Sequence, residues 1–428
     1  MIHKIIYKIG THLWNNRIGT NYKFLLDSQF WSRDQLVDYQ NKKLCELIAS
    51  AYVQCDYYKK LFDDNGLKPD DIKTVADLKL IPTTSKVALL ANKDAIQTTV
   101  AGEKMYYSET SGSTGEPLVF YRNKDWVAWH NASVFRGYNW YGVNPWDRNG
   151  YLWGYNLSAK QAMKTKILDA VQNRFRLFSY SDDEIKEFCH KLKSAKCLNG
   201  YSSMIYEVAK FVDEDDSLKD KINLSFVKGT SEKILDKYQP VAMSAFGKKI
   251  ISEYGAAEAG IIAFECPEGN MHVNMETVVV EEFENKILVT NLVSNSFPII
   301  RYELGDYIKL DTESLCECGR KGHLIKEVLG RVGKSIYGLQ GKFPSLTLYY
   351  IFKNLAVDHH LVFNYQAVQR KKGHIEFRIE QSLSEVERQL MIAEIVKYFQ
   401  GDIVYQIKDG VRLITRKGKM KDFISEID

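Results

Sequence analysis

Between residues 151 and 254 the sequence alternates short β-like runs with helical segments, and this alternation restricts the fold more than any other feature. Three runs have the composition of buried strands and three helical patterns lie among them: strands at 151–154, 224–228 and 248–254, helices at 182–193, 203–212 and 233–245. Such alternation favours a mostly parallel sheet with helices on its faces, and ligands bind such sheets at the loops beyond the strand ends. The predicted fold class is therefore α/β.

The regions on either side of this segment differ in their helix-like and strand-like residue patterns, and these patterns predict two domains. The first hundred residues look helical, including one helical pattern over 35–60, and residues 266–330 are rich in β-like runs. Residues 361–428 read as strand, strand, helix, strand. We expect a large layered N-terminal body at 1–330, with a β-rich subdomain at about 266–330, and a small α+β C-terminal lid domain at 331–428.

Composition excludes several classes of protein. The chain has 428 residues, 45% apolar and 26% charged, which is typical of a folded globular protein. Its net charge of +4 does not favour a nucleic-acid partner. Seven cysteines spread along a long chain disfavour a disulfide scaffold and favour a reducing cytoplasm. We expect neither a membrane span nor a secretory signal, because no apolar run is long enough for a span and no cleavage-site pattern follows the start.

The first residues form an amphipathic pattern. One helical face gathers the apolar side chains, with Lys4 and Lys8 beside it: Ile2, Ile5, Ile6, Ile9 and Leu13. A helix of this kind usually packs on the protein body through its apolar face. The alternative is a helix that docks on a membrane surface or on a partner.

Residues 107–117 form a Ser/Gly-rich loop that is suited to phosphate. Gly112 and Gly115 let the backbone turn tightly and approach a ligand closely. Backbone N–H groups and four hydroxyls could cradle a pyrophosphate, those of Thr110, Ser111, Ser113 and Thr114. A strand-like run at 119–121 places the loop at a hairpin tip. The loop lacks the Gly-Lys-Ser/Thr of a Walker A loop, and an ordinary Ser/Gly linker is the alternative.

The loop, Ser108-Glu109-Thr110-Ser111-Gly112-Ser113-Thr114-Gly115-Glu116-Pro117, resembles the signature of the adenylate-forming superfamily, in particular the phenylacetate–coenzyme A ligase branch and its CapK-type relatives. Leu118 stands where the superfamily usually has lysine. Further segments resemble family motifs in the family's order: 199–204, 228–232, 254–258, 301–306, 330–331, 341–345 and 417–419. The resemblance therefore spans residues 107–419.

This resemblance implies an activity. The family activates a carboxylate with ATP and Mg²⁺ as an acyl-AMP and then passes the acyl group to an acceptor. The acceptor implied here is the thiol of coenzyme A or an amine, and the CapK-type likeness implies capsule or O-antigen polysaccharide biosynthesis. The alternative is a non-catalytic, nucleotide-binding scaffold that retains the fold, which Ala257 favours because the family usually has a hydroxyl there.

The resemblance also implies roles for individual residues. Positions 110–115 would bind the phosphates, and Thr230, Ser231 and Glu232 would lie along the adenine. Tyr254 would stack on the adenine, with Gly255 and Ala256 beside it. These residues form the adenine and phosphate part of the predicted site.

The remaining roles concern the metal, the ribose and the reaction itself. Glu258 would hold Mg²⁺ and Asp306 would accept hydrogen bonds from the ribose hydroxyls. Arg331 would lie near the ribose or phosphate. Lys419 would be the catalytic cation between the carboxylate and the α-phosphate, with Lys417 and Lys421 as rivals in the same turn. Solvated surface charges are the alternative for each of these residues.

Three cysteines and a histidine predict a zinc site. Cys266, His272, Cys316 and Cys318 supply three thiolates and one imidazole, a complete tetrahedral set for structural Zn²⁺. Ordinary core cysteines are the alternative. The resemblance supports the metal, because members of the phenylacetate-ligase branch have a similar cluster.

The carboxylate substrate is not specified by the motifs. Six aromatic residues are candidates to line its pocket, with core packing as the alternative: Tyr138, Trp140, Tyr141, Trp153, Tyr155 and Tyr201.

Overall fold

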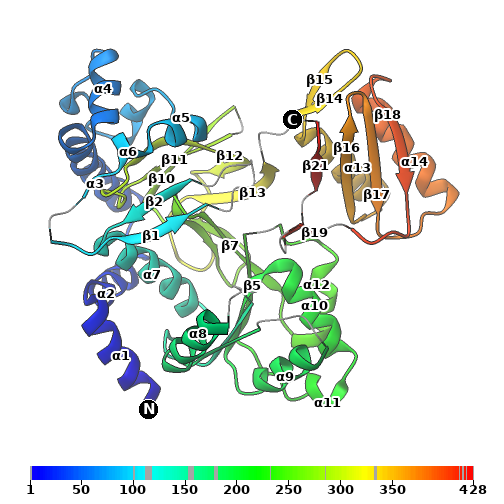
Figure 1. Cartoon of the computed structure of the whole chain (residues 1–428), viewed down its shortest axis with the longest axis horizontal. Helices are drawn as coiled ribbons and strands as arrows, with labels where there is room; N and C mark the ends of the chain where they lie inside the picture. The colour runs from blue at the N-terminus through cyan, green and yellow to red at the C-terminus, as the bar shows by residue number, and fades with distance from the viewer. Residues whose placement is uncertain are drawn as a thin grey trace.

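The computed structural model of the chain describes residues 2–99, 102–110, 118–152, 159–177, 182–231, 233–284, 286–331, 335–413, 415–416, 419–420 and 422–427. A large mixed sheet with helices forms the body, and a separate small sheet with its own helices stands beside it near the C-terminus (Figure 1). The predicted α/β class is confirmed.

The central sheet has the strand order β10-β11-β12-β13-β9-β8-β7-β6-β5-β3-β4. Its parallel half comprises β3 Asn149–Leu152, β4 Arg174–Arg176, β5 Cys197–Tyr201, β6 Phe226–Thr230 and β7 Ile250–Ala256. Its antiparallel half comprises β8 Gly260–Glu265, β9 Met271–Val273, β10 Val278–Phe283, β11 Lys286–Asn291, β12 Ile299–Asp311 and β13 Leu324–Arg331. The β-rich stretch therefore extends the same sheet.

Helices cover the parallel strands, which agrees with the burial of four of the five residues in both β5 and β6. The helices are α8 Ala159–Val171, α9 Asp182–Leu192, α10 Ser202–Asp213, α11 Asp216–Lys219 and α12 Tyr238–Phe246. Leu198, Val208 and Val227 are fully buried in the core between helix and sheet. The helix predicted over 233–245 begins only at Tyr238, because Pro240 lacks an N–H and fits only the first turn of a helix.

The N-terminal helices pack on the antiparallel half of the sheet and on the hairpin formed by β1 (Tyr106–Glu109) and β2 (Val119–Arg122). They are α1 Ile2–Asn15, α2 Arg17–Ser28, α3 Arg33–Gln54, α4 Asp56–Asp64, α5 Lys86–Ala91, α6 Lys93–Ile96 and α7 Lys124–Asn139, with 3₁₀ turns at Pro69–Asp71 and Val75–Leu80. Ser32 and Gln35 form a capping box that fixes the start of α3. The single helix expected over 35–60 is interrupted at Cys55, whose backbone is extended.

The C-terminal unit has its own apolar core, which includes Ile351, Phe377 and Ile395. Its sheet has the order β18-β17-β16-β21, and its elements are β14 Ser335–Tyr337, β15 Lys342–Pro344, α13 Leu346–His359, β16 Tyr365–Lys371, β17 His374–Ile379, α14 Glu385–Phe399, β18 Val404–Lys408, β19 Thr415–Arg416, β20 Lys419–Met420 and β21 Phe423–Ser425. The predicted order of strand, strand, helix and strand is confirmed. Among the described residues, no helix is both long and apolar enough to cross a membrane.

Candidate functional site

The predicted phosphate loop joins the two strands of a hairpin. β1 (Tyr106–Glu109) and β2 (Val119–Arg122) pair antiparallel, and the Thr110 N–H donates to the Leu118 carbonyl at 3.0 Å. The Leu118 N–H in turn donates to the Thr110 hydroxyl at 2.9 Å. The expected hairpin is thus confirmed, with Thr110 at the base of the loop. Ser111, Gly112, Ser113, Thr114 and Gly115 lie outside the described residues.

Two residues from separate predicted motifs meet beyond the parallel half of the sheet. The Tyr254 hydroxyl donates to Asp306 Oδ2 at 2.8 Å, across 52 positions of sequence. Tyr254 lies near the end of β7, and Asp306 lies in β12 opposite Arg331 of β13. An aromatic ring and a carboxylate from two separate predicted motifs therefore stand together. The Arg331 side chain lies outside the described part of the chain.

The β7–β8 hairpin requires glycine at position 255. A Cβ atom there would lie 2.3 Å from the Gly260 carbonyl oxygen, and the strand register shifts between Tyr254 and Gly255. Ala256 pairs with Gly260 where the two strands meet. The close approach of the two backbones fixes the direction in which Tyr254 leaves the sheet.

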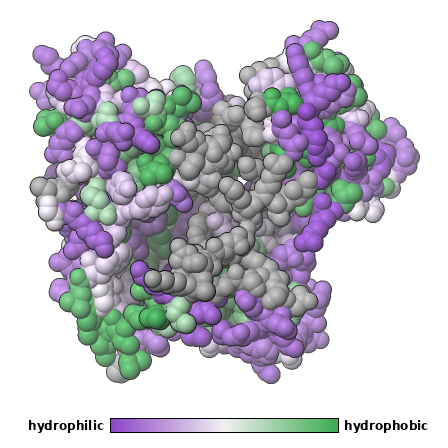
Figure 2. All heavy atoms as spheres, in the orientation of Figure 1, coloured by the Kyte–Doolittle hydropathy of each residue, from purple (hydrophilic) through white to green (hydrophobic). Residues whose placement is uncertain are grey.

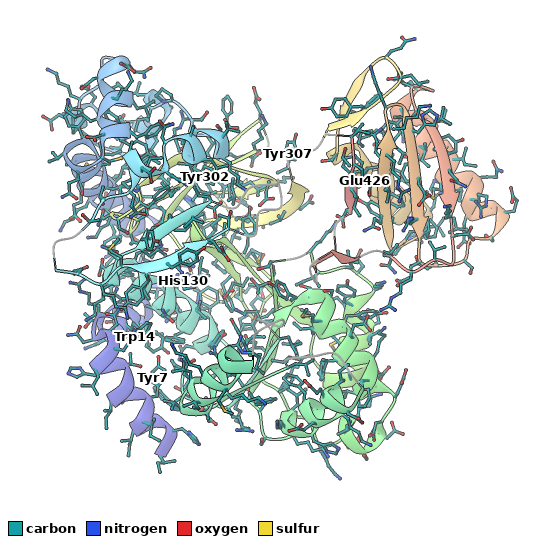
Figure 3. The ribbon with its side chains drawn as sticks, viewed as in Figure 1. Tyr7, Trp14, His130, Tyr302, Tyr307 and Glu426 are labelled. Atoms are coloured by element: carbon teal, nitrogen blue, oxygen red, sulfur yellow. The ribbon has the colours of Figure 1, made fainter. Side chains whose placement is uncertain are left out.

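Glu258 lies in this hairpin and is buried, with 6% of its surface exposed. The hydroxyl of Tyr302, labelled in Figure 3, donates to Glu258 Oε1 at 3.1 Å. Segments 301–306 and 254–258 are therefore in contact at a second point, besides the bond between Asp306 and Tyr254. Arg301, in contrast, forms an ion pair with Glu281 at 3.0 Å and donates to the Ile81 carbonyl at 2.7 Å. The arginine of the motif therefore ties the N-terminal helices to the sheet.

The predicted adenine-side residues lie at the end of β6. The Thr230 hydroxyl donates to the Glu253 carbonyl at 3.4 Å, and Ser231 has a left-handed backbone with φ of 64°. The chain turns sharply out of the sheet at this point. Glu232 lies outside the described residues.

The predicted catalytic lysine is in the C-terminal unit. Lys419 begins β20, which pairs with β19, and β19 lies on the side of that unit that faces the body (Figure 1). The Lys419 side chain is not described, and Lys417 and Lys421 lie outside the described residues.

The four predicted metal ligands form a cluster. Cys266 follows β8, His272 is on β9, and the two remaining cysteines lie between β12 and β13. All four ligand atoms lie within 4.8 Å of one another. The Cys266 and Cys316 sulfurs are 3.7 Å apart, and Cys318 Sγ is 3.2 Å from His272 Nε2. Thiolates bound to one tetrahedral zinc at about 2.3 Å would be about 3.8 Å apart. The geometry therefore suits a metal ion.

The chemistry of the cluster suits a metal as well. Burial, reinforced by the charges of Arg320 and Arg136, lowers the pKa of His272 to about 4, so the imidazole is neutral at pH 7 and can donate a lone pair. Burial also raises the pKa of Cys266 to about 12, which leaves the thiol protonated unless a cation is present. Three of the four ligand residues are buried, which is typical of a structural centre.

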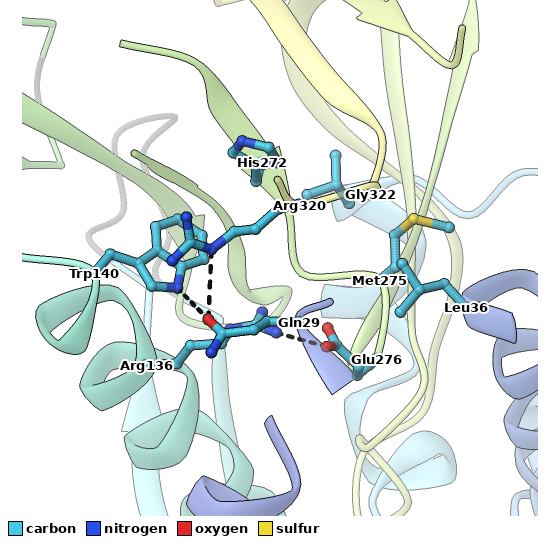
Figure 4. Close-up of a pocket in the computed structure, with 10 residues that line it drawn as sticks. Gln29, Leu36, Arg136, Trp140, His272, Met275, Glu276, Arg320 and Gly322 are labelled. Carbon is cyan, nitrogen blue, oxygen red and sulfur yellow. Dashed lines mark hydrogen bonds and ion pairs between the residues drawn. The ribbon is translucent and has the colours of Figure 1, made fainter. Parts of the chain in front are cut away.

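A small polar pocket lies behind the cluster (Figure 4). Arg320 stacks over Trp140 at 4.2 Å, and the Trp140 indole donates to Gln29 Oε1 at 2.8 Å. Next to them, Arg136 forms an ion pair of 2.6 Å with Glu276, and both side chains are almost fully buried. Trp140 therefore packs against the cluster, with its ring 5.8 Å from that of His272.

Sequence reasoning missed this supporting network and a second buried ion pair. Lys228 Nζ and Glu253 lie 2.6 Å apart on β6 and β7, directly below Thr230. Lys228 is the first residue of the segment 228–232, and the resemblance of that segment to a family motif could have drawn attention to this lysine. The Arg136–Glu276 pair joins residues 140 positions apart, and no local pattern marks it.

Comparison with known proteins agrees with this geometry. No protein-family model matches the chain. Protein CapK of Staphylococcus aureus is 25% identical over 315 residues, which are 70% of this chain and 68% of that relative. A phenylacetate-coenzyme A ligase of Aromatoleum evansii is 34% identical over 128 residues, which are 29% of each chain. A phenylacetate-coenzyme A ligase of Thermus thermophilus is 22% identical over 427 residues, which are 89% of this chain and 91% of that relative.

The chain is thus similar in sequence to Protein CapK and to phenylacetate-coenzyme A ligases. Among solved structures, a 2-hydroxyisobutyryl-CoA ligase in the postadenylation state has a TM-score of 0.71 at 14% identity, covering 93% of this chain and 91% of that one. That likeness establishes the fold of an adenylate-forming ligase over nearly the whole chain.

Proposed function

We propose that this protein activates a carboxylate with ATP as an acyl-AMP and transfers the acyl group to an acceptor. The observation that carries the proposal is the contact between Tyr254 and Asp306, because it brings two family-like motifs together near the carboxyl end of β7. The acceptor would be coenzyme A or an amine. On the likeness to CapK-type proteins, the pathway would be surface polysaccharide biosynthesis in the cytoplasm.

The proposed chemistry depends mainly on holding two anions together, because the carboxylate must approach the α-phosphate. The loop at 111–115 would receive the phosphates, with Thr110 at its base. Asp306 would accept hydrogen bonds from the ribose, since an ionised carboxylate only accepts. Glu232 and Arg331 would line the nucleotide, and Tyr254 would cover the adenine ring.

Glu258 is the residue that we propose for Mg²⁺. Its carboxylate is buried and held by Tyr302, and carboxylate oxygens are the ligands that Mg²⁺ prefers. The ion would neutralise charge on the phosphates.

Residues 331–428 are proposed to act as a lid that delivers Lys419. The body and this unit are joined by an ion pair between Lys237, just before α12, and Glu380, just after β17. A contact between two surface side chains of this kind can break without loss of a core. The lid could therefore rotate between the two half-reactions.

The cysteine cluster is proposed to bind a structural Zn²⁺. Its four protein ligands leave no open position for water, so the ion would stabilise the fold and would not activate a nucleophile. Elemental analysis should find about one zinc per chain. Cys316→Ala should lose the metal, and Cys45→Ala, a cysteine outside the cluster, should keep it. Less than about half a zinc per chain would contradict the site.

Exchange of labelled pyrophosphate into ATP tests the ligase activity directly. A panel of aryl acids, fatty acids, amino acids and uronic acids should contain at least one acid that supports exchange. Asp306→Asn should lower exchange with that acid by about 100-fold, because it removes the charged acceptor. Asp38→Asn, which changes an exposed carboxylate on α3, should leave exchange unchanged.

The alternative of a scaffold protein predicts a different result. Such a protein would show no exchange with any acid. If it also bound no ATP, the proposed activity would be wrong. If it bound ATP without exchange, a nucleotide-binding scaffold would replace the ligase.

A further inference from the structure

Helix α1 exposes its apolar face. Its five large aliphatic side chains are 39 to 78% exposed: Ile2, Ile5, Ile6, Ile9 and Leu13. At 100° per residue they occupy one side of the helix. The helix expected to bury this side instead points it at solvent, although removal of apolar side chains from water is favourable. Exposure of all five is therefore costly in water alone.

The opposite face of α1 anchors the helix to the body. The Tyr7 ring packs against Phe135 and Trp146 at 5.9 and 6.0 Å. Asn15 is fully buried, and its side-chain amide donates to the Lys124 carbonyl at 2.7 Å. Tyr7 and Trp14 are labelled on this helix in Figure 3. The outward direction of the apolar face is thus fixed by specific contacts on the inward face.

Helix α8 contacts α1 and adds apolar surface of the same kind. Met163, Ile167, Leu168 and Val171 are 64, 60, 50 and 49% exposed. We call these four and the five aliphatic residues of α1 the apolar patch. Figure 2 shows hydrophobic side chains gathered at the lower left, where α1 lies in Figure 1. An exposed patch of this kind marks an interaction surface.

The exposed charged side chains of α1 and of the described part of α8 are lysines, and Glu187 on the neighbouring α9 interacts with Lys166. Helix α1 contains no Asp or Glu; its exposed Lys8 lies near the apolar face, whereas Lys4 lies over the Trp146 ring at 5.2 Å. On α8, Lys164 and Lys166 are exposed. The sole acidic residue of α8, Asp169, is buried and pairs with Arg174 and Arg176 at 2.7 and 2.9 Å. An anionic surface would complement these helices.

We propose that α1 and α8 dock the protein onto the surface of an anionic phospholipid bilayer. A helix with a strong apolar face and lysines at its border lies in the plane of the headgroups and buries that face. Trp14, 48% exposed, packs edge-on against Tyr106 of the body at 6.0 Å and helps to hold the end of α1 in place. α1 is at the edge of the body away from the C-terminal unit, so docking leaves that unit free (Figure 1).

A second copy of the chain fits the apolar patch less well. In a two-fold dimer the same surface meets itself, and the lysines of both copies would come together. Like charges oppose such a contact, whereas anionic lipid attracts lysines that lie near its surface. Charge complementarity therefore selects the bilayer.

Flotation of the full-length protein with vesicles tests the proposal. The protein should float with phosphatidylcholine vesicles that contain phosphatidylglycerol, and should float less with phosphatidylcholine alone or at high salt. Ile9→Glu/Leu13→Glu should lower binding by at least about 10-fold, because it charges the buried face. Lys8→Glu should lower it by several-fold. The matched control is Val53→Glu on α3, a residue that is 79% exposed and far from the patch in sequence.

Three results would overturn the proposal. The first is a wild-type protein that floats with neither kind of vesicle. The second is an α1 double variant that floats as well as the wild type. The third is a dimer in sedimentation that the double variant converts to a monomer, which would assign the patch to a second copy. Circular dichroism of each variant shows whether α1 and the body remain folded.

Discussion

The residues proposed to bind the nucleotide, here called the nucleotide end, and the cysteine cluster lie at opposite ends of the same strands. Glu258 precedes β8 and Cys266 follows it. Asp306 is in β12, which leads toward Cys316, and β13 starts after Cys318 and ends at Arg331. At a rise of about 3.3 Å per residue, the six residues of β8 separate the two ends by about 20 Å.

The two ends of these strands are expected to contribute differently, the cluster end to stability and the nucleotide end to activity. At the cluster end, side chains from three segments converge with buried partners, so a metal there would hold the strands together but could not reach a nucleotide. At the other end, hydrogen bonds such as that between Tyr254 and Asp306 join the predicted groups. We therefore expect changes at the cluster end to affect unfolding, and changes at the nucleotide end to affect activity.

The largest effect is expected from loss of the cluster. Cys316→Ala/Cys318→Ala should lower the free energy of unfolding by about 5 kcal/mol or more, because structural zinc contributes roughly 10–16 kcal/mol of apparent binding energy in small zinc domains. Thermal unfolding measures the change, with Cys45→Ala as the control. An unchanged melting temperature would show that the strands need no metal at this end.

The ion pair behind the cluster should give the next largest effect. Arg136→Met leaves Glu276 buried without its cation and should cost about 3–5 kcal/mol in chemical denaturation. Lys60→Met breaks an ion pair whose side chains are 76 and 58% exposed, and should cost less than about 0.5 kcal/mol. An equal loss of stability in the two variants would show that burial does not determine how much these ion pairs contribute.

A backbone change at the nucleotide end should cost less stability. Gly255→Ala puts a methyl group 2.3 Å from a backbone oxygen and should destabilise the fold by about 2–3 kcal/mol, because backbone must shift. Gly19→Ala on α2, where a Cβ has open space, should be neutral or slightly stabilising. If both variants unfold like wild type, the hairpin is less rigid than the structure indicates.

The smallest effect on the fold is expected at Tyr254. Tyr254→Phe keeps the ring and removes the hydroxyl that holds the Asp306 carboxylate, so the KM for ATP should rise by about 10-fold, while the melting temperature should fall by only a few degrees. Tyr52→Phe removes a similar bond, 2.7 Å to Asp63, on the exposed N-terminal helices and should leave KM unchanged. Equal KM values would show that the Tyr254 hydroxyl does not position the nucleotide.

Much of this arrangement could be predicted from local sequence. The alternation over 151–254 predicted three of the five parallel strands, because strands covered on both faces are rich in apolar residues. The ligand types at 266, 272, 316 and 318 indicated one metal, since thiolates and imidazole rarely gather by chance. Motif order indicated the superfamily, although the loop at 111–115 and Glu232 lie outside the described residues.

Other features depended on contacts across long stretches of chain. The composition of α1 predicts an amphipathic helix, but only the packing of Tyr7 and Asn15 decided that its apolar face points outward. The pairing of Arg136 with Glu276, and the stacking of Arg320 on Trp140, join residues more than 100 positions apart. The sequence by itself determined residue types, periodicity and therefore elements. The tertiary structure decided which faces are buried and which charges meet, because burial and pairing are properties of the packed chain and no local segment contains them.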